Sequence, residues 1–264
     1  MISILWFTNK SINIKLALSC TLSLALIAPT VKAVYEPSTQ KPVPTDHRSG
    51  TGTTRGTTRG CSGEDMPLTV LASRSYVGRT ISGHPTLAWF VPRDSASKPV
   101  ELMIYEWVPS GTPKIVRKMS LQSSPGVMKL SPFSKNEPGL QPGKEYLWQV
   151  VIHCDPDNPS GDLVSEASLE VVGMPTNILQ SELNKAINGV EKANIYARAG
   201  LWYDALDEAL KLAEASKLGE LGSILLNDLA KSEALKTTSK LPLKERDATE
   251  KQVVTLQQIA RSAR

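Results

Sequence analysis

The hydrophobic pattern of the chain changes its period once, close to Pro175, and this change constrains the fold more than any other feature. Before it, from residue 64 to 172, short runs of Val, Ile, Leu and aromatic residues alternate with clusters of Gly, Pro and Ser. After it, apolar residues recur at the spacing of an α-helix. Short bounded runs predict strands, and the helical period predicts helices. We therefore expect a β part followed by a helical part.

The β part holds runs with the length and composition of strands. They cover residues 68–72, 85–91, 99–107, 114–121, 126–130, 145–153 and 163–172. Short strands at this spacing predict an all-β, antiparallel sandwich, immunoglobulin-like in size, over residues 61–173. The alternation is clearest near Trp148, which shares one face of its strand with Val150, Ile152 and Cys154.

The helical part is predicted to form a small domain over residues 174–236, beginning at Pro175-Thr176-Asn177. Residues 190–213 predict two helices broken at Gly200, with small residues spaced as in one tetratricopeptide-like hairpin. A third helix is predicted near 220–235. One such unit buries little surface alone, so we expect it to pack on the sandwich or on a partner.

The first 33 residues have the parts of an export signal. Lys10 and Lys15 precede an apolar run from Leu16 to Ala28, and Val31-Lys32-Ala33 fits a cleavage site after Ala33. A membrane anchor is the alternative, but the run is shorter than the roughly 20 residues that span a bilayer. We expect cleavage, no transmembrane anchor afterwards, and export to the periplasm or the extracellular space.

Two polar segments flank the predicted domains. Residues 34–60 are rich in Pro, Gly and Thr, contain TGTTRGTTRG, and are predicted to be a disordered linker. Residues 237–264 are predicted to be a polar tail with a weak helix around Val253 to Ile259. The repeated TTRG could be a nucleic-acid tail, but export argues against a nucleic-acid partner.

Charge also argues against a nucleic-acid partner. The chain has 30 basic and 26 acidic residues, and cleavage removes Lys10, Lys15 and Lys32, which leaves 27 against 26. A nearly neutral mature protein has no bulk attraction to nucleic acid or to anionic lipid.

Cysteine usage predicts one covalent cross-link. Cys20 leaves with the signal peptide, so the mature chain keeps Cys61 and Cys154. Export places this pair in an oxidising compartment, where disulfides persist. We expect a Cys61–Cys154 bond that fastens the start of the sandwich to the end of a later strand; two free thiols or an intermolecular bridge are the alternatives.

Catalytic and metal-binding motifs are not found. The histidines are His47, His84 and His153, and no pair of them has the spacing of zinc ligands. The acidic segment from Asp155 to Glu166 has the length of a calcium loop, but Pro159 occupies a ligand position. Turn chemistry explains the same residues as a hairpin connection. We therefore expect no cofactor and no metal.

Two aromatic sets are candidates for contact with a ligand or partner. Met103, Tyr105 and Trp107 share one face of a predicted strand and could form an exposed apolar patch. The interpretation favoured for them is burial on both strand faces, one of them under the helical domain. Trp202 and Tyr203 begin a helix after Gly200 and are favoured as a packing anchor against the sandwich.

Several short motifs together carry a resemblance to a known family. They include Gly60-Cys61-Ser62, His84-Pro85-Thr86 and Cys154-Asp155-Pro156, and the most specific is the Tyr196 to Leu206 segment, Tyr-Ala-x-Ala-Gly-x-Trp-Tyr-Asp-Ala-Leu. From about residue 60 to 235 the chain resembles the cyanobacterial family catalogued as domain of unknown function 928. The resemblance implies an exported protein without an assigned activity, and it supplies no catalytic residues.

These observations favour a non-enzymatic interaction module of the envelope or the extracellular space, with an unidentified protein as its partner. A carbohydrate-binding module that uses Met103, Tyr105 and Trp107 to bind a glycan is the alternative hypothesis. A hydrolase of an unrecognised type is a third.

Overall fold

A computed structural model describes most of the chain beyond the predicted signal peptide. The described residues are 34–37, 41–43, 61, 66–95, 97–108, 111–174, 176–236 and 243–264. The predicted signal peptide, residues 1–33, and most of the predicted linker lie outside them. Within the described ranges, no helix has the length and apolar character needed to cross a membrane.

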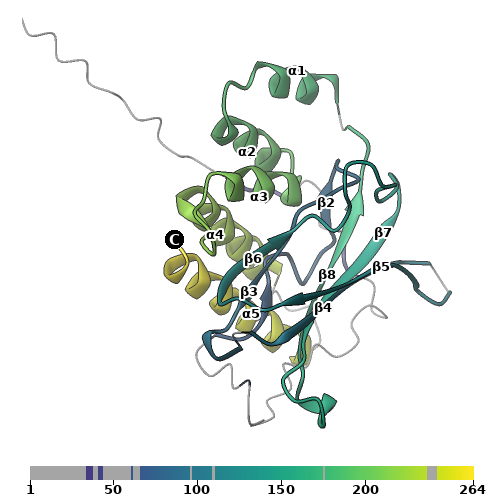
Figure 1. Ribbon diagram of the computed structural model, residues 1–264. Helices are drawn as coiled ribbons and strands as arrows, with labels where there is room; N and C mark the ends of the chain where they lie inside the picture. Colours follow the sequence, from purple (N-terminus) through teal and green to yellow (C-terminus); the bar gives the residue numbers. More distant parts are fainter. Residues whose placement is uncertain are drawn as a thin grey trace, which may run out of the picture. The chain divides into compact units, whose positions relative to one another are not determined.

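Two β-sheets occupy the first part of the described chain (Figure 1). The strands are β1 (Thr69–Val70), β2 (Gly78–Thr80), β3 (Leu87–Val91), β4 (Pro99–Glu106), β5 (Lys114–Gln122), β6 (Gly126–Leu130), β7 (Glu145–Ile152) and β8 (Leu163–Val171). One sheet has the order β1-β3-β6, and the other has the order β2-β8-β7-β4-β5. Each predicted strand is present, and the buried side chains of both sheets belong to one hydrophobic core.

Strand β2 was not predicted, and it makes the sandwich mixed rather than wholly antiparallel. It pairs in parallel with β8, with Thr80 opposite Val171. Its sequence, Gly78-Arg79-Thr80, holds no aliphatic or aromatic residue, so it carries no alternation. The strand forms because its backbone completes the edge of a sheet that longer strands have already specified.

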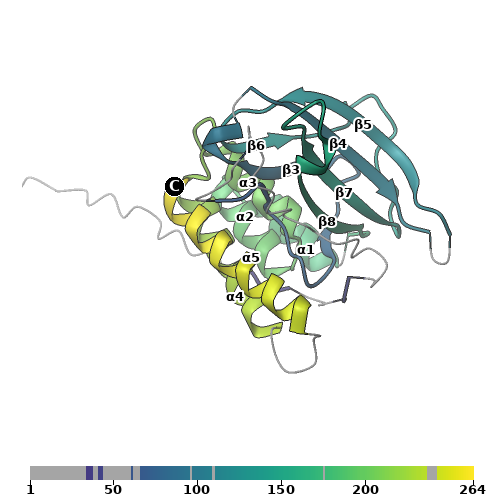
Figure 2. The same ribbon diagram turned by 90° about the horizontal axis from the view of Figure 1, so that it is seen from below.

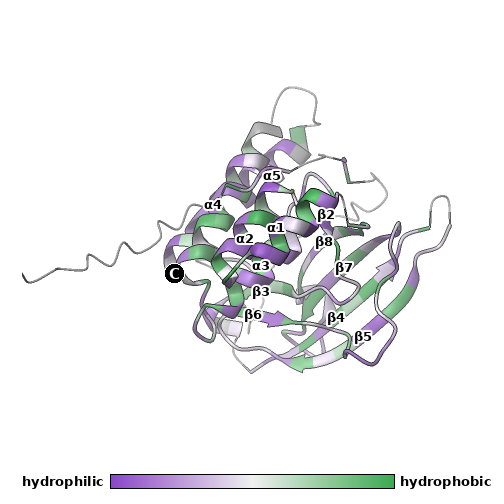
Figure 3. Ribbon diagram, turned by 90° about the horizontal axis from the view of Figure 1, so that it is seen from above, coloured by the Kyte–Doolittle hydropathy of each residue, from purple (hydrophilic) through white to green (hydrophobic). Residues whose placement is uncertain are grey.

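The five-stranded sheet has an inner face turned to the core and an outer face that is partly exposed. On β7 the inner side chains are Tyr146, Trp148, Val150 and Ile152, all buried, as the alternation predicted. Their neighbours along the strand point the other way and are mostly half-buried. Figure 3 shows the resulting mixture of apolar and polar residues along β4 and β5.

The helices are α1 (Asn177–Lys185), α2 (Gly189–Arg198), α3 (Trp202–Lys211), α4 (Gly219–Lys236) and α5 (Leu243–Ser262). Helix α1 begins as predicted, with the Thr176 side chain accepting a hydrogen bond from the Leu179 N–H at 3.0 Å. The break between α2 and α3 falls at Gly200, whose φ of 71° favours glycine. The likeness of this pair to a tetratricopeptide unit stays a prediction.

Helix α5 is much longer than the weak helix predicted around Val253 to Ile259 of the polar tail. It is 20 residues long and packs along α4 (Figure 2). Its buried residues include Thr249, Leu256, Ile259 and Ala260. They follow helical spacing, but they are few among the polar and charged residues of the segment, so its hydrophobic signal is weak.

The predicted disordered linker is also wrong at its start. Tyr35 is buried with its ring edge-on to Trp202, at a centroid distance of 4.9 Å. Its N–H donates to Asp228 Oδ2 at 3.3 Å, and Pro42 forms a β-bridge with Tyr76. A few apolar anchors between polar residues produce no periodicity, which is why the pattern suggested a solvated spacer.

Candidate binding site

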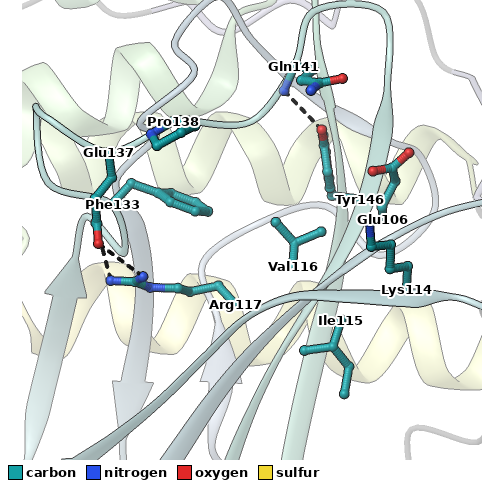
Figure 4. A pocket seen from close by; sticks show the side chains of 11 residues that line it. Glu106, Lys114, Ile115, Val116, Arg117, Phe133, Glu137, Pro138, Gln141 and Tyr146 are labelled. Atoms are coloured by element: carbon teal, nitrogen blue, oxygen red, sulfur yellow. Dashed lines mark hydrogen bonds and ion pairs between the residues drawn. The ribbon is translucent and has the colours of Figure 1, made fainter.

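A pocket of about 390 Å³ lies between the inner face of the five-stranded sheet and the loop that joins β6 to β7 (Figure 4). Pockets for small-molecule ligands generally measure about 300–1,000 Å³. The lining residues come from β4, β5, β7 and the loop, and they are Glu106, Lys114, Ile115, Val116, Arg117, Phe133, Glu137, Pro138, Gly139, Gln141 and Tyr146.

A β-bulge shapes the strand wall of the pocket. The β4–β5 register shifts between Ile104, which pairs with Arg117, and Tyr105, which pairs with Ile115. Val116 therefore has no partner on β4, and the strand twists locally there. The shift falls within the four consecutive β5 residues, 114–117, that line the pocket.

The loop wall is held against the turn before β3. The Leu140 N–H donates to the Gly83 carbonyl at 2.7 Å, and His84 Nε2 lies 3.0 Å from the Glu137 carbonyl. At Gly139 a Cβ atom would collide with Gly83, so the loop can approach this closely only with glycine there. His84 therefore helps to hold the loop in place.

An Arg–Glu pair connects the two walls. The Arg117 terminal nitrogens each lie 3.3 Å from an oxygen of Glu137, and the guanidinium lies 5.5 Å from the centre of the Phe133 ring. The Ser134 N–H and Arg117 together hold the pKa of the Glu137 carboxyl below its usual range. The Arg117 Nε is buried and has no hydrogen-bond partner among the described residues. The pair closes one side of the pocket.

The opposite side combines a second ion pair with a tyrosine. Lys144 Nζ lies 2.7 Å from Glu106 Oε1. The Tyr146 hydroxyl accepts a hydrogen bond from the Gln141 N–H at 2.9 Å, and burial raises the pKa of that hydroxyl. With Val116 and Phe133, these groups give an apolar interior and a charged rim. Such a site can hold an apolar side chain and orient polar atoms beside it.

The sequence did not identify this pocket. Arg117 and Glu137 are 20 residues apart in the sequence. Arg117 lies on β5 and Glu137 lies in the loop between β6 and β7, so no local motif contains both. The clusters of Pro and Gly around residue 140 were interpreted only as turn signals. A signal that could have been used is the presence of two apolar side chains, Phe133 and Leu140, in a loop made otherwise of polar residues, Pro and Gly.

Met103, Tyr105 and Trp107 lie at the outer face of the five-stranded sheet, away from the pocket interior, and are half-buried. The Tyr105 hydroxyl donates to the Met103 sulfur at 2.9 Å. Tyr105 is paired with Leu147 on β7 and with Ile115 on β5. Helix α3 contacts the inner face, through Tyr203 and Trp148, and the outer face that carries this set is half-buried. The favoured interpretation, burial on both strand faces, is therefore met only on the inner face.

Trp202 and Tyr203 are packing anchors, the interpretation favoured from the sequence, and both are buried. Trp202 Nε1 donates to the Leu71 carbonyl at 2.9 Å. The Tyr203 hydroxyl accepts from Trp148 Nε1 at 2.9 Å and donates to the Ser168 carbonyl at 3.3 Å. They join α3 to both sheets and are not accessible to a ligand.

Asp204, the next residue, was not singled out from the sequence. It is buried, and its Oδ2 accepts the Ile81 N–H at 3.1 Å. Burial raises the pKa of this carboxyl to about 7, although the hydrogen bonds from Ile81 and Thr80 oppose the shift. Asp204 therefore anchors α3 to the end of β2. The free energy that its burial costs depends on pH, because the carboxylate is harder to bury than the neutral acid.

Cys61 and Cys154 lie within bonding distance, as predicted, with their Cα atoms 5.6 Å apart. The neighbouring acidic segment joins the antiparallel strands β7 and β8, so the hairpin interpretation is confirmed. Its acids have different partners: Asp155 accepts from the Asp157 N–H, and Asp162 binds His153 and the Cys154 N–H. Within the described residues, no group of three acidic, His or Cys residues could hold a metal.

Comparison with known proteins gives one family match. Residues 50–243 match the model of the Domain of Unknown Function DUF928. The human structure titled "Solution Structure of The Third Fibronectin III Domain of Human KIAA0343 Protein" is 17% identical, covers 46% of this chain and 94% of its own, and has a TM-score of 0.25, too low to support an argument. No curated protein matches the chain. Because the family model spans well over half of the sequence, the chain belongs to the DUF928 family.

Proposed function

We propose that this protein is an exported, non-enzymatic interaction module that binds a partner protein at the pocket beside β5. The observation that carries the proposal is the pocket itself, with its apolar interior between two ion pairs. Apolar centres with charged rims are typical of protein-binding sites. The lining holds no Ser, Thr, Cys or His, and its two carboxylates, Glu106 and Glu137, each form an ion pair with a basic side chain.

Export is part of the proposal and has independent support. The leader has the composition of a cleavable signal, and the cysteine pair at bonding distance fits an oxidising compartment. Glycan binding at Met103, Tyr105 and Trp107 is the less favoured function, because the Tyr105 hydroxyl is already bonded to the Met103 sulfur.

Site-specific photo-crosslinking in cells that export the protein tests the proposal. The photoreactive residue replaces Gln141, an exposed residue at the pocket of which only the backbone N–H is used in the site, and in a control chain it replaces Glu250, an exposed residue of α5. We expect a defined protein adduct from position 141 that position 250 does not give. Identical adducts at both positions, or none at 141, would overturn the proposal. A glycan array in which Trp107→Ala abolishes specific binding would favour the carbohydrate alternative.

A further inference from the structure

We propose that the partner presents an extended, acid-bearing segment, which adds to the open edge of β5 as a further strand and places an apolar side chain in the pocket. This inference rests on the proposed function and specifies the chemistry of its partner. It is carried by the open edge of β5, the direction of the β5 backbone groups, and the charge of that strand.

Strand β5 is an edge strand with nine residues, Lys114–Gln122. It ends the sheet order β2-β8-β7-β4-β5, and the next strand along the chain, β6, belongs to the other sheet. Among the described residues, no strand pairs with its second edge. An edge of this length presents a row of backbone donors and acceptors to any extended chain.

The backbone hydrogen bonds define which β5 residues face outward. The Ser123 N–H donates to the Lys98 carbonyl, so even-numbered residues of β4 bond to β5. The other side of β4 agrees, because the odd-numbered Pro99 and Trp107 bond to residues at the two ends of β7. On β5, the backbone N–H and C=O groups of residues 117, 119 and 121 therefore bond to β4. Those of residues 118, 120 and 122 point to the open edge.

The pocket lies where an added strand would pass. Residues 114–117 of β5 all line it, so a segment paired along this edge runs beside the pocket. In strand addition, backbone hydrogen bonds supply affinity, and pockets for alternate side chains supply specificity. The apolar interior formed by Val116, Phe133 and Tyr146 fits an apolar side chain from that segment.

Charge argues for an acid-bearing segment and against a second copy of this chain. Strand β5 contains Lys114, Arg117 and Lys118 and no acidic residue. Glu137 and Glu101 pair with Arg117 and Lys118, and Glu106, which lies opposite Lys114, pairs with Lys144. The site therefore holds one positive charge in excess, at Lys114. Two β5 strands paired with each other would bring like charges into opposition, which destabilises a sheet.

Proline substitution at the open edge separates strand addition from other modes of binding. Ser120→Pro removes an outward N–H from an exposed position and leaves the pairing with β4 in place, whereas Ser120→Ala removes only the hydroxyl. Each variant carries the photoreactive residue at position 141, and adduct yields are compared at equal abundance of folded protein. We expect adduct yield to fall about ten-fold with Pro and to stay unchanged with Ala, since a lost backbone hydrogen bond costs about that factor. If Ser120→Pro does not fold, Gln122→Pro at the next outward residue replaces it.

Two outcomes overturn this inference while the proposed function stands. One is an unchanged adduct yield in a folded proline variant. The other is an adduct whose linked segment, mapped by mass spectrometry, lacks acidic residues or belongs to a second copy of this chain. Absence of any adduct from the parent chain would instead overturn the proposed function, so the two failures are distinguishable.

Discussion

The Cys61–Cys154 bond should supply a large part of the stability of the folded unit. The two cysteines are 93 residues apart in the sequence, so the cross-link closes a long loop in the unfolded chain. In the chain-entropy treatment a loop of this length is worth about 4.6 kcal/mol, an upper figure because residual structure in the unfolded state reduces it. Most domains have a total stability of about 5–15 kcal/mol, so the loss should be obvious.

Urea unfolding of the mature protein measures this contribution. The comparison needs oxidised protein, the same protein reduced, and a Cys61→Ala/Cys154→Ala double variant. Both cysteines are buried, so the double variant also loses packing, whereas reduction changes only the cross-link. We expect reduction to lower the free energy of unfolding by about 2–4 kcal/mol, and the double variant to lose at least as much.

The disulfide prediction has two clear failure points. Protein isolated from the exported fraction without reductant should resist alkylation at both cysteines until it is reduced. Alkylation of both native thiols would refute the bond. A reduction-induced change below about 1 kcal/mol would refute the loop-entropy argument even if the bond exists, because closing so long a loop should cost the unfolded chain much more.

Three further substitutions test the packing of the chain around α3. Tyr35→Ala should lower the free energy of unfolding by about 3–5 kcal/mol in urea melts, with the exposed Glu36→Ala nearly neutral; equal effects would contradict the packing of Tyr35. Gly200→Val should lower the free energy of unfolding by at least about 1–2 kcal/mol, because Gly200 has a positive φ, and Gly200→Asn should lower it less. As pH rises from 4 to 8, the free energy of unfolding of Asp204→Asn should rise by up to about 4 kcal/mol relative to that of the parent. The reason is that the raised pKa of about 7 makes ionisation of Asp204 costly in the folded parent. A difference between variant and parent that does not depend on pH would refute this.

The sequence predicted elements with a strong local period and missed those whose stability comes from tertiary contact. The β7 alternation through Trp148 and Val150 and the helix break at Gly200 were both predictable from local rules. Strand β2 was not, because its three residues pair through backbone alone. Helix α5 was underestimated because its buried residues are few and include Thr249 and the small Ala260, and the helix is buried by packing on α4.

The candidate site was the part least accessible from the sequence. Its walls meet only because Gly139 allows the loop to approach Gly83 and because the bulge at Val116 twists the edge strand. Neither feature has a composition that distinguishes it from an ordinary turn or strand. The outward direction of the Ser120 backbone follows from pairing parity, which requires the register of two sheet neighbours and cannot be derived from β5 alone.

The most specific motif of the family resemblance has a structural role, which explains why it leads to no chemistry. Its consecutive residues Trp202, Tyr203 and Asp204 each bind a different β element: the chain after β1, the paired strands β7 and β8, and the end of β2. One turn of α3 therefore ties the helices to both sheets, and the helical part is not a separable domain. These three side chains are buried, so they present little surface to a ligand or partner. The binding proposed at the edge of β5 uses residues outside the motif, among which Lys114 and Ser120 are exposed.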